Sequence, residues 1–240
     1  MGDPVYRPVV TGFKAVFAGL GLRFDIRGLD NIPLTGGAVL SINHTSYLDF
    51  ALSGIPANRR GKRLVRFMAK DSVFRHRVSG PLMRGMKHIP VDREAGSQAF
   101  REAVRVLKEG ELVGVFPEAT MSRSMDIKPI KSGAVRMAIA GGVPVIPMCV
   151  FGGARVYSYG HKDFKRGKTI AITVGEPMLV KRGDDAEALT VELRQRMREL
   201  LDETVARYPG ERASWWIPAR LGGTAPLPAD VGEADEDAES

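Results

Sequence analysis

The sequence lacks several features that would each define a class of protein. It holds one cysteine, Cys149, inside an apolar run, which excludes an internal disulfide and a thiolate metal cluster and indicates a core residue rather than a nucleophile. The apolar runs near Val39 and Val145 are far shorter than the roughly 20 residues that cross a bilayer, so no transmembrane helix is expected. The N-terminus does not combine a basic start, a continuous apolar stretch and a cleavage site, so we expect no secretory signal and a cytoplasmic protein.

Signatures of bound metals and nucleotides are also missing. His76, His88 and His161 have no metal-ligand spacing with one another or with nearby acids, so we expect surface or core roles for them and no metal. Gly141 and Gly142 precede a strand-like run, whereas a nucleotide-binding fingerprint opens a helix after a strand.

The sequence is rich in positive charge, which is unevenly placed. The net charge is +7 although six of the 28 acidic residues lie in the last eleven positions. Residues 59–93 hold eleven Lys or Arg against only Asp71 and Asp92. Such a surface attracts phosphoglycerides, nucleotide-bearing cofactors, acidic carrier proteins or nucleic acid, unless it serves only solubility. Phe67 and Phe74 are the only aromatic residues there that could stack on bases, so nucleic acid is not an expected partner.

Alternating strand-like and helical patterns predict the fold class. Strand-like runs occupy residues 22–27, 38–42, 64–69, 88–91, 112–116, 143–150 and 169–174, and helical patterns occupy residues 95–109, 132–140 and 184–207. This alternation favours an α/β fold, with a mostly parallel sheet covered by helices on both faces. A length of 240 residues fits a single domain, whose site we expect at the strand ends.

Both ends of the chain differ from this domain, which we place at residues 26–208. Within residues 1–25, an amphipathic helix is predicted over 8–22, and its apolar face either packs on the domain or lies among membrane headgroups. Residues 209–240 have the Gly, Pro, Ala and acid content of a disordered acidic tail. Trp215 and Trp216 are its exception, and we expect them to dock on the domain rather than at a membrane interface.

One pair of residues points to acid–base chemistry. The run 38–42 leads directly into His44, and Asp49 follows where a helix begins. Five residues turn about 140° on a helix, so the two side chains can meet only if His44 lies in the turn before it. With Ser46 as N-cap, Asp49 would be the third helical residue and accept the imidazole N–H. Alternatively, Ser46 and Asp49 only cap the helix and His44 satisfies a buried backbone group.

The His44 and Asp49 pair lies in the first of four sequence blocks. Asn43 to Asp49 fits the pattern N-H-x-S-x-x-D, and three blocks follow it: Ile89-Pro90-Val91-Asp92-Arg93, Phe116-Pro117-Glu118-Ala119-Thr120 and Val143-Pro144-Val145-Ile146-Pro147. Over residues 38–150 the chain therefore resembles the lysophosphatidic acid acyltransferase (PlsC-like) family of glycerolipid acyltransferases.

The resemblance implies roles for six residues. His44 would be the general base that activates an acceptor hydroxyl, and Asp49 would orient it. Lys70 would contact an oxyanion or phosphate. Arg93, Glu118 and Thr120 would bind the acceptor phosphate, although Arg93 could instead pair with a neighbouring acid and Glu118 could only order its loop.

Two departures from the family pattern concern the acceptor. Ala119 stands at the usual glycine of F-P-E-G-T-R, and Met121 stands where a second phosphate-binding arginine is common. Arg123, Lys128 or Lys131 could supply the missing charge.

The implied activity is acyl transfer from acyl-CoA or acyl-carrier protein to the sn-2 hydroxyl of 1-acylglycerol 3-phosphate, with no further cofactor. The implied location is the cytoplasmic face of the cell membrane, where the basic protein would lie peripherally on anionic lipid. Two alternatives remain open. One is the same chemistry on glycerol 3-phosphate, another lysophospholipid or a glycolipid, and the other is a non-catalytic protein that binds anionic lipid.

Overall fold

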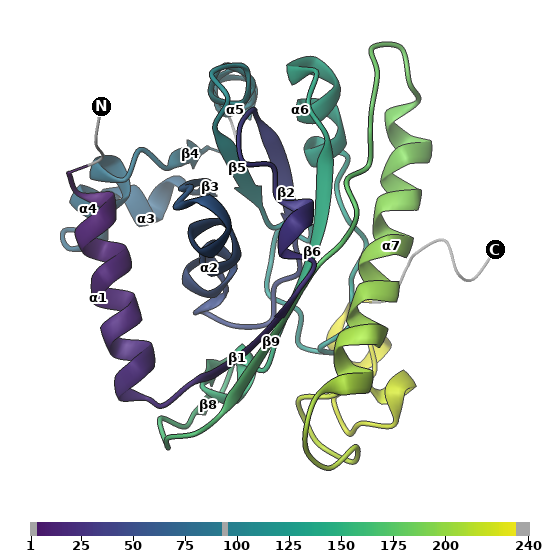
Figure 1. Ribbon diagram of the computed structural model, residues 1–240. Coiled ribbons are helices and arrows are strands. Elements are labelled where there is room, and N and C mark those ends of the chain that lie inside the picture. Colours follow the sequence, from purple (N-terminus) through teal and green to yellow (C-terminus); the bar gives the residue numbers. More distant parts are fainter. Residues whose placement is uncertain (1–3, 93–95, 234–240) are drawn as a thin grey trace.

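The computed structural model describes residues 4–92 and 96–233. Its centre is a seven-stranded sheet of order β1-β9-β6-β2-β5-β3-β4 (Figure 1). The strands are β1 (Arg23–Arg27), β2 (Ala38–Ile42), β3 (Val65–Lys70), β4 (Ile89–Val91), β5 (Leu112–Val115), β6 (Val145–Phe151) and β9 (Thr169–Val174). All neighbours pair in parallel except β6 and β9, so five adjacent strands run one way and the β1–β9 pair runs the other. The predicted, mostly parallel sheet is confirmed.

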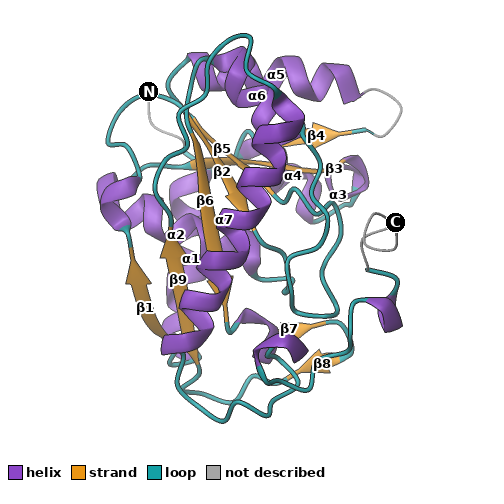
Figure 2. Ribbon diagram, turned by 90° about the vertical axis from the view of Figure 1, so that its right-hand side faces the viewer, coloured by secondary structure: helices purple, strands orange, loops and turns teal. Residues whose placement is uncertain are grey.

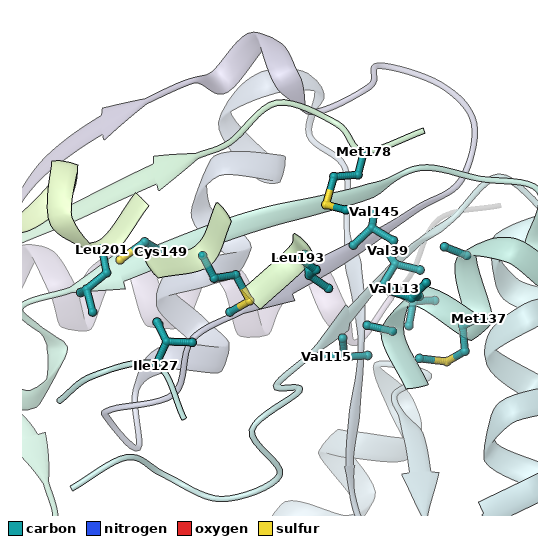
Figure 3. Close-up of a cluster of buried hydrophobic side chains, with 14 of the residues drawn as sticks. Val39, Val113, Val115, Ile127, Met137, Val145, Cys149, Met178, Leu193 and Leu201 are labelled. Atoms are coloured by element: carbon teal, nitrogen blue, oxygen red, sulfur yellow. The ribbon is translucent and has the colours of Figure 1, made fainter. Parts of the chain in front are cut away.

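Helices cover both faces of the sheet, which explains why its central strands are buried and mostly apolar. Alternate residues of a strand face opposite sides, and Val39 packs with α5 (Gly96–Lys108), α6 (Gly133–Gly141) and α7 (Ala186–Arg207) while Leu40 packs with α2 (Asp49–Gly61). Figure 3 shows the strand valines grouped near Leu193 of α7, and Leu201 of α7 beside Cys149 of β6. Figure 2 shows α7 crossing one face of the sheet.

The predicted N-terminal helix is present as α1 (Tyr6–Gly19), and it packs on the domain. Phe17 is buried, the Phe13 ring meets Phe50 of α2 edge to face at 5.5 Å, and Lys14 Nζ donates to Asn58 Oδ1. Val16 on the outer side is 56% exposed. Over residues 4–92 and 96–233, no helix is both long and apolar enough to span a bilayer.

The structure corrects the extent of the C-terminal tail. Residues 209–233 follow the surface of the domain and include the short helices η3 (Ala219–Leu221) and η4 (Ala229–Val231). Trp215 packs with Met125, Ala154 and Ala225, and its ring lies 4.4 Å from that of His161. The expected docking of the tryptophans is thus confirmed, while the acidic residues 234–240 lie outside the described residues.

Short elements that the sequence analysis did not identify complete the fold. They are α3 (Asp71–Arg75), α4 (Ser79–Gly85), the two-residue strands β7 (Tyr157–Ser158) and β8 (His161–Lys162), and the 3₁₀ turns η1 (Leu29–Asn31) and η2 (Gly153–Arg155).

Candidate active site

The carboxyl ends of the parallel strands bring the candidate residues to one edge of the sheet. His44 follows β2, Glu118 follows β5, and Lys70 is the last residue of β3. Because β5 pairs with both β2 and β3, these three positions lie on consecutive strands. This edge is where open α/β sheets form their sites.

His44 and Asp49 are in direct contact. His44 Nδ1 lies 3.1 Å from Asp49 Oδ2, and the carboxylate is fully buried while the imidazole side chain keeps 25% of its surface exposed. A carboxylate can only accept, so the ring proton is on Nδ1 and Nε2 is the nitrogen that can receive another. The arrangement therefore provides an oriented base that solvent or substrate can reach.

The turn reaches this geometry by a different route from the one expected. Helix α2 begins at Asp49 itself, with Leu48 at the N-cap position, so Ser46 is not the cap and Asp49 is the first rather than the third helical residue. Instead, the Ser46 hydroxyl accepts from Leu48 N and donates to Tyr157 O. A serine hydroxyl that closes a local turn in this way competes with helix initiation, so the helix begins further along the chain.

Two aromatic rings fix the plane of the imidazole. The His44 ring stacks on Phe116 at 4.4 Å and 28°, and Phe116 in turn stacks on Phe67 of β3 at 6.2 Å. The ring thus has an apolar wall on one side and the Asp49 carboxylate at Nδ1.

Asn43 and Gly153 support the turn, and sequence reasoning assigned neither a role. The Asn43 amide donates to Val150 O and accepts from Val150 N, which joins the end of β2 to β6. A Cβ on Gly153 would lie 3.2 Å from Asp49 Oδ1 and 3.0 Å from Ser46 Cβ, so any larger residue there would crowd the carboxylate and its turn. Asn43 belongs to the first sequence block, which was the available signal.

Glu118 is buried beneath the turn. Its Oε1 accepts from His44 N at 2.9 Å and its Oε2 accepts from Lys128 N at 3.2 Å. Burial raises the pKa of the Glu118 carboxyl to about 8, against the opposing effects of these hydrogen bonds and the Lys128 charge. This position supports the interpretation that Glu118 orders its loop, and its contact with substrate stays a prediction.

Lys128 lies where the third block needs a positive charge. Its ammonium donates to Thr120 Oγ1 at 2.5 Å and to Met121 O at 3.4 Å, although Lys128 is eight residues further along the chain. Of the three basic residues considered as substitutes for the missing arginine, Lys128 is the one whose ammonium is hydrogen-bonded to Thr120, and Thr120 itself is exposed.

The structure says less about the remaining two candidate residues, Lys70 and Arg93. Lys70 is exposed at the site edge of the sheet, on the far side of β5 from His44. Arg93 lies outside the described residues, two positions after the end of β4. Their proposed contacts with oxyanion or phosphate stay predictions.

An apolar crevice opens near the aromatic wall. It lies between α1 and α2 and is lined by Val9, Phe13, Phe50 and Phe67, with a volume of about 40 Å³. Phe67 also stacks on Phe116, which stacks on His44, so the rings of Phe67 and Phe116 lie between the crevice and His44. A volume of this size admits little more than water, so a larger apolar group would have to displace α1.

Comparisons with known proteins agree with one another. The family model described as Acyltransferase matches residues 23–151. A 1-acyl-sn-glycerol-3-phosphate acyltransferase of Bacillus subtilis is 32% identical over 192 residues, which cover 75% of this chain and 90% of that protein. A chloroplastic 1-acyl-sn-glycerol-3-phosphate acyltransferase of Brassica napus is 27% identical over 75% of this chain and 51% of its own, so the chain spans about half of that relative's length. The crystal structure of the acyltransferase PlsC from Thermotoga maritima has a TM-score of 0.70 at 24% identity, over 85% of this chain and 81% of that one, and has the same fold.

Proposed function

Since the chain belongs to the lysophosphatidic acid acyltransferase (PlsC-like) family and is an acyltransferase, we propose that it acylates the sn-2 hydroxyl of 1-acylglycerol 3-phosphate to give phosphatidic acid. The observation that carries the proposal is the contact between His44 and the buried Asp49 at the edge of the sheet. The acyl donor is a thioester, on coenzyme A or an acyl-carrier protein.

The pair of residues accounts for the proton transfers. His44 Nε2 takes the proton of the acceptor hydroxyl as the hydroxyl oxygen attacks the thioester carbonyl. The tetrahedral oxyanion then expels the thiolate, which receives that proton from the imidazolium. Asp49 holds the ring by Nδ1 and stabilises the imidazolium while it exists. A positioned base of this kind contributes roughly a hundred- to ten-thousand-fold to the rate.

Direct transfer to the lipid is favoured over an acyl-enzyme on cysteine. Cys149 is buried among α7 side chains, and burial raises the pKa of its thiol to about 12. A thiol that stays protonated and inaccessible is a poor nucleophile. The reaction as written needs no further cofactor.

The basic surface supports a location for the reaction at a membrane. We propose that residues 59–92 face the anionic headgroups of the cytoplasmic leaflet, where the chain lies peripherally and where Lys70 and the lysophospholipid phosphate would meet. The acyl chain would enter the crevice between α1 and α2 by displacing α1, whose outer side carries exposed Val16.

His44→Ala tests the mechanism. Acyl transfer to 1-acylglycerol 3-phosphate should fall by at least about a hundredfold while the melting temperature changes little, because the ring is partly exposed. His76→Ala, which removes an exposed histidine of another segment, is the matched control and should keep full activity. Undiminished transfer by a folded His44→Ala variant would refute the mechanism, and no transfer by the unaltered protein would favour a purely lipid-binding role.

The identity of the acceptor is a separate question, because Met121 stands where the family commonly has a second phosphate-binding arginine. The same chemistry on glycerol 3-phosphate, another lysophospholipid or a glycolipid is the second candidate. Initial rates on a panel of these acceptors separate the two, and activity restricted to acceptors without phosphate would remove the phosphate-binding roles of Arg93 and Thr120.

A further inference from the structure

The loop after the third block binds a carboxylate from the far end of the chain. Glu233 Oε1 accepts from Arg123 N at 2.8 Å, and its Oε2 accepts from Ser124 N at 3.0 Å and from the Ser122 hydroxyl at 3.2 Å. Lys128 Nζ lies 4.0 Å from Oε1, and the Glu233 side chain is only 7% exposed. A surface glutamate that merely neutralised a lysine would not be enclosed by three hydrogen-bond donors of one loop.

The donors of this loop form the kind of site that proteins use for tetrahedral oxyanions. Two successive backbone N–H groups, a hydroxyl and an ammonium converge on one point, and concave groups of backbone N–H recur in phosphate sites. Met125, the next residue, is held at φ +60°, in the left-handed region that side chains other than glycine rarely adopt. The loop is therefore constrained in the conformation that presents these donors.

The loop is joined to the catalytic turn. Ser122 N donates to His44 O at 2.7 Å, so the first residue of the loop is hydrogen-bonded to the backbone of the general base. Lys128 also reaches Thr120 of the third block. An anion held by the loop would lie next to the reaction site rather than on a remote surface.

The segment that supplies Glu233 leaves open space beside α7. Leu227 is 53% exposed, and a cavity of about 380 Å³ lies between this segment and α7, with charged lining residues Asp126, Lys128, Arg194, Arg198 and Glu233. Its volume is in the range of small-ligand sites, and three of these five residues are basic. Moving the segment would join the cavity to the donors around Glu233.

We propose that residues 122–128 form an oxyanion site for a phosphate monoester, and that Glu233 occupies this site as a ligand built into the chain. A phosphate must displace Glu233 to bind. It carries more charge and one more acceptor oxygen than a carboxylate, so it can do so, but Glu233 competes at the high effective concentration of a tethered group. The identification of the phosphate with the acceptor headgroup rests on the proposed function.

Titration with inorganic phosphate tests the site without any acyl transfer. The amide signals of Arg123 and Ser124 should shift with phosphate in the Glu233→Ala variant, with an apparent Kd lower than in the unaltered protein by roughly fivefold or more. Asp230→Ala removes the same charge from the same segment at an exposed position and should bind phosphate like the unaltered protein. Equal affinity in the Glu233→Ala and unaltered proteins, or no shift of these amides in the variant, would overturn the proposal. If Glu233→Ala does not fold, Glu233→Gln keeps an acceptor oxygen without the charge and is read in the same way.

Acyl-transfer kinetics identify the source of the phosphate. A lower KM for 1-acylglycerol 3-phosphate in Glu233→Ala than in Asp230→Ala assigns the site to the lipid headgroup. An unchanged KM beside tighter phosphate binding assigns it to free phosphate. Absence of acyl transfer in every variant would count against the proposed function but would not change what the phosphate titration says about the site.

Discussion

One oxygen of Asp49 accepts from three donors in the turn between β2 and α2. The backbone nitrogens of Thr45 and Ser46 each lie 2.7 Å from Oδ2, and His44 Nδ1 lies 3.1 Å from it. The two backbone donors hold the carboxylate whether or not the imidazole is present. Replacement of His44 should therefore remove the proposed base and leave the turn in place, which is why activity and folding can be separated at this residue.

Ala119 carries backbone strain that a glycine would not. Its φ is +63°, a left-handed conformation that costs an L-residue about 1 to 2 kcal/mol, whereas a glycine in the unfolded chain costs about 0.4 to 1 kcal/mol of entropy. We expect Ala119→Gly to leave the free energy of unfolding unchanged or to raise it by up to about 1.5 kcal/mol.

Urea denaturation of matched variants measures this strain. Ala188→Gly, at an exposed position in the first turn of α7, should lose about 0.5 to 1 kcal/mol, as glycine usually does in a helix. Equal losses in the two variants would show that the left-handed conformation of Ala119 carries no strain.

The distance along the chain decided which site contacts were predictable. The His44 and Asp49 contact is local: the five-residue spacing across a strand-to-helix turn allowed it, and the resemblance of the first block favoured it over the capping alternative. The contacts of Glu118 with His44 and Lys128, and of Lys128 with Glu233, join residues that no short pattern connects. They could be known only after the strands were placed side by side.

At the scale of elements, His88 joins β4 to β3 at the edge of the sheet. It lies directly before β4, its Nδ1 accepts from Phe67 N of β3 at 3.0 Å, and its ring meets Tyr6 of α1 edge to face at 5.4 Å. Burial, together with the nearby Arg66 guanidinium, lowers the pKa of His88 to about 4. An acceptor nitrogen that must stay unprotonated makes this junction sensitive to acid.

The sign of the pH dependence follows from the lowered pKa of His88. Between pH 6.5 and 4 the unfolded chain binds a proton that the folded chain excludes, so this stability is present above pH 6.5 and is lost as the pH falls. From pH 7 to pH 5 the loss due to His88 is about 2 kcal/mol. His88→Gln keeps an acceptor for Phe67 N but does not titrate, so we expect its free energy of unfolding to fall by about 2 kcal/mol less over this range.

Urea unfolding at pH 7 and pH 5 measures the difference. Exposed His76→Gln is the control and should follow the unaltered protein. The same acid-induced loss in His88→Gln and the unaltered protein would show that another group titrates instead.

The long elements were predictable and the short ones were not. Runs of apolar residues fixed β2 and β9 to the residue, since fully buried strands leave a continuous apolar signal. The strands β7 and β8 have two residues each, and α3 and α4 have five and seven, which is too short for a periodic pattern to be recognised. These elements are stabilised by tertiary contacts, such as that of His161 with Trp215.

At the scale of the whole molecule, composition understated how far the C-terminal segment is ordered. Its Gly, Pro and acidic residues indicate disorder, yet Ile217 and Ala225 are buried and Trp215 adds a large apolar surface. A few large side chains anchor a segment that has almost no regular structure. The segment also brings two charged residues to the loop at residues 122–128, where Arg220 binds Asp126 and Glu233 accepts from the backbone of Arg123.

Arg220 is the charged anchor of this arrangement, and its removal should destabilise the molecule. Its guanidinium binds the buried Asp126 through two hydrogen bonds, of 2.6 and 3.0 Å, and also pairs with Asp202 of α7. Arg220→Ala would leave the Asp126 carboxylate with one hydrogen bond from Ile127 N and with Arg198 at 3.8 Å, and we expect a loss of about 2 to 3 kcal/mol in the free energy of unfolding. Arg196→Ala breaks an exposed pair with Glu192 on the same helix and should cost less than about 0.5 kcal/mol. Urea denaturation compares the two. A similar small loss in both would mean that Asp126 does not depend on Arg220, and that the tryptophans and Glu233 are sufficient to hold the C-terminal segment against the loop.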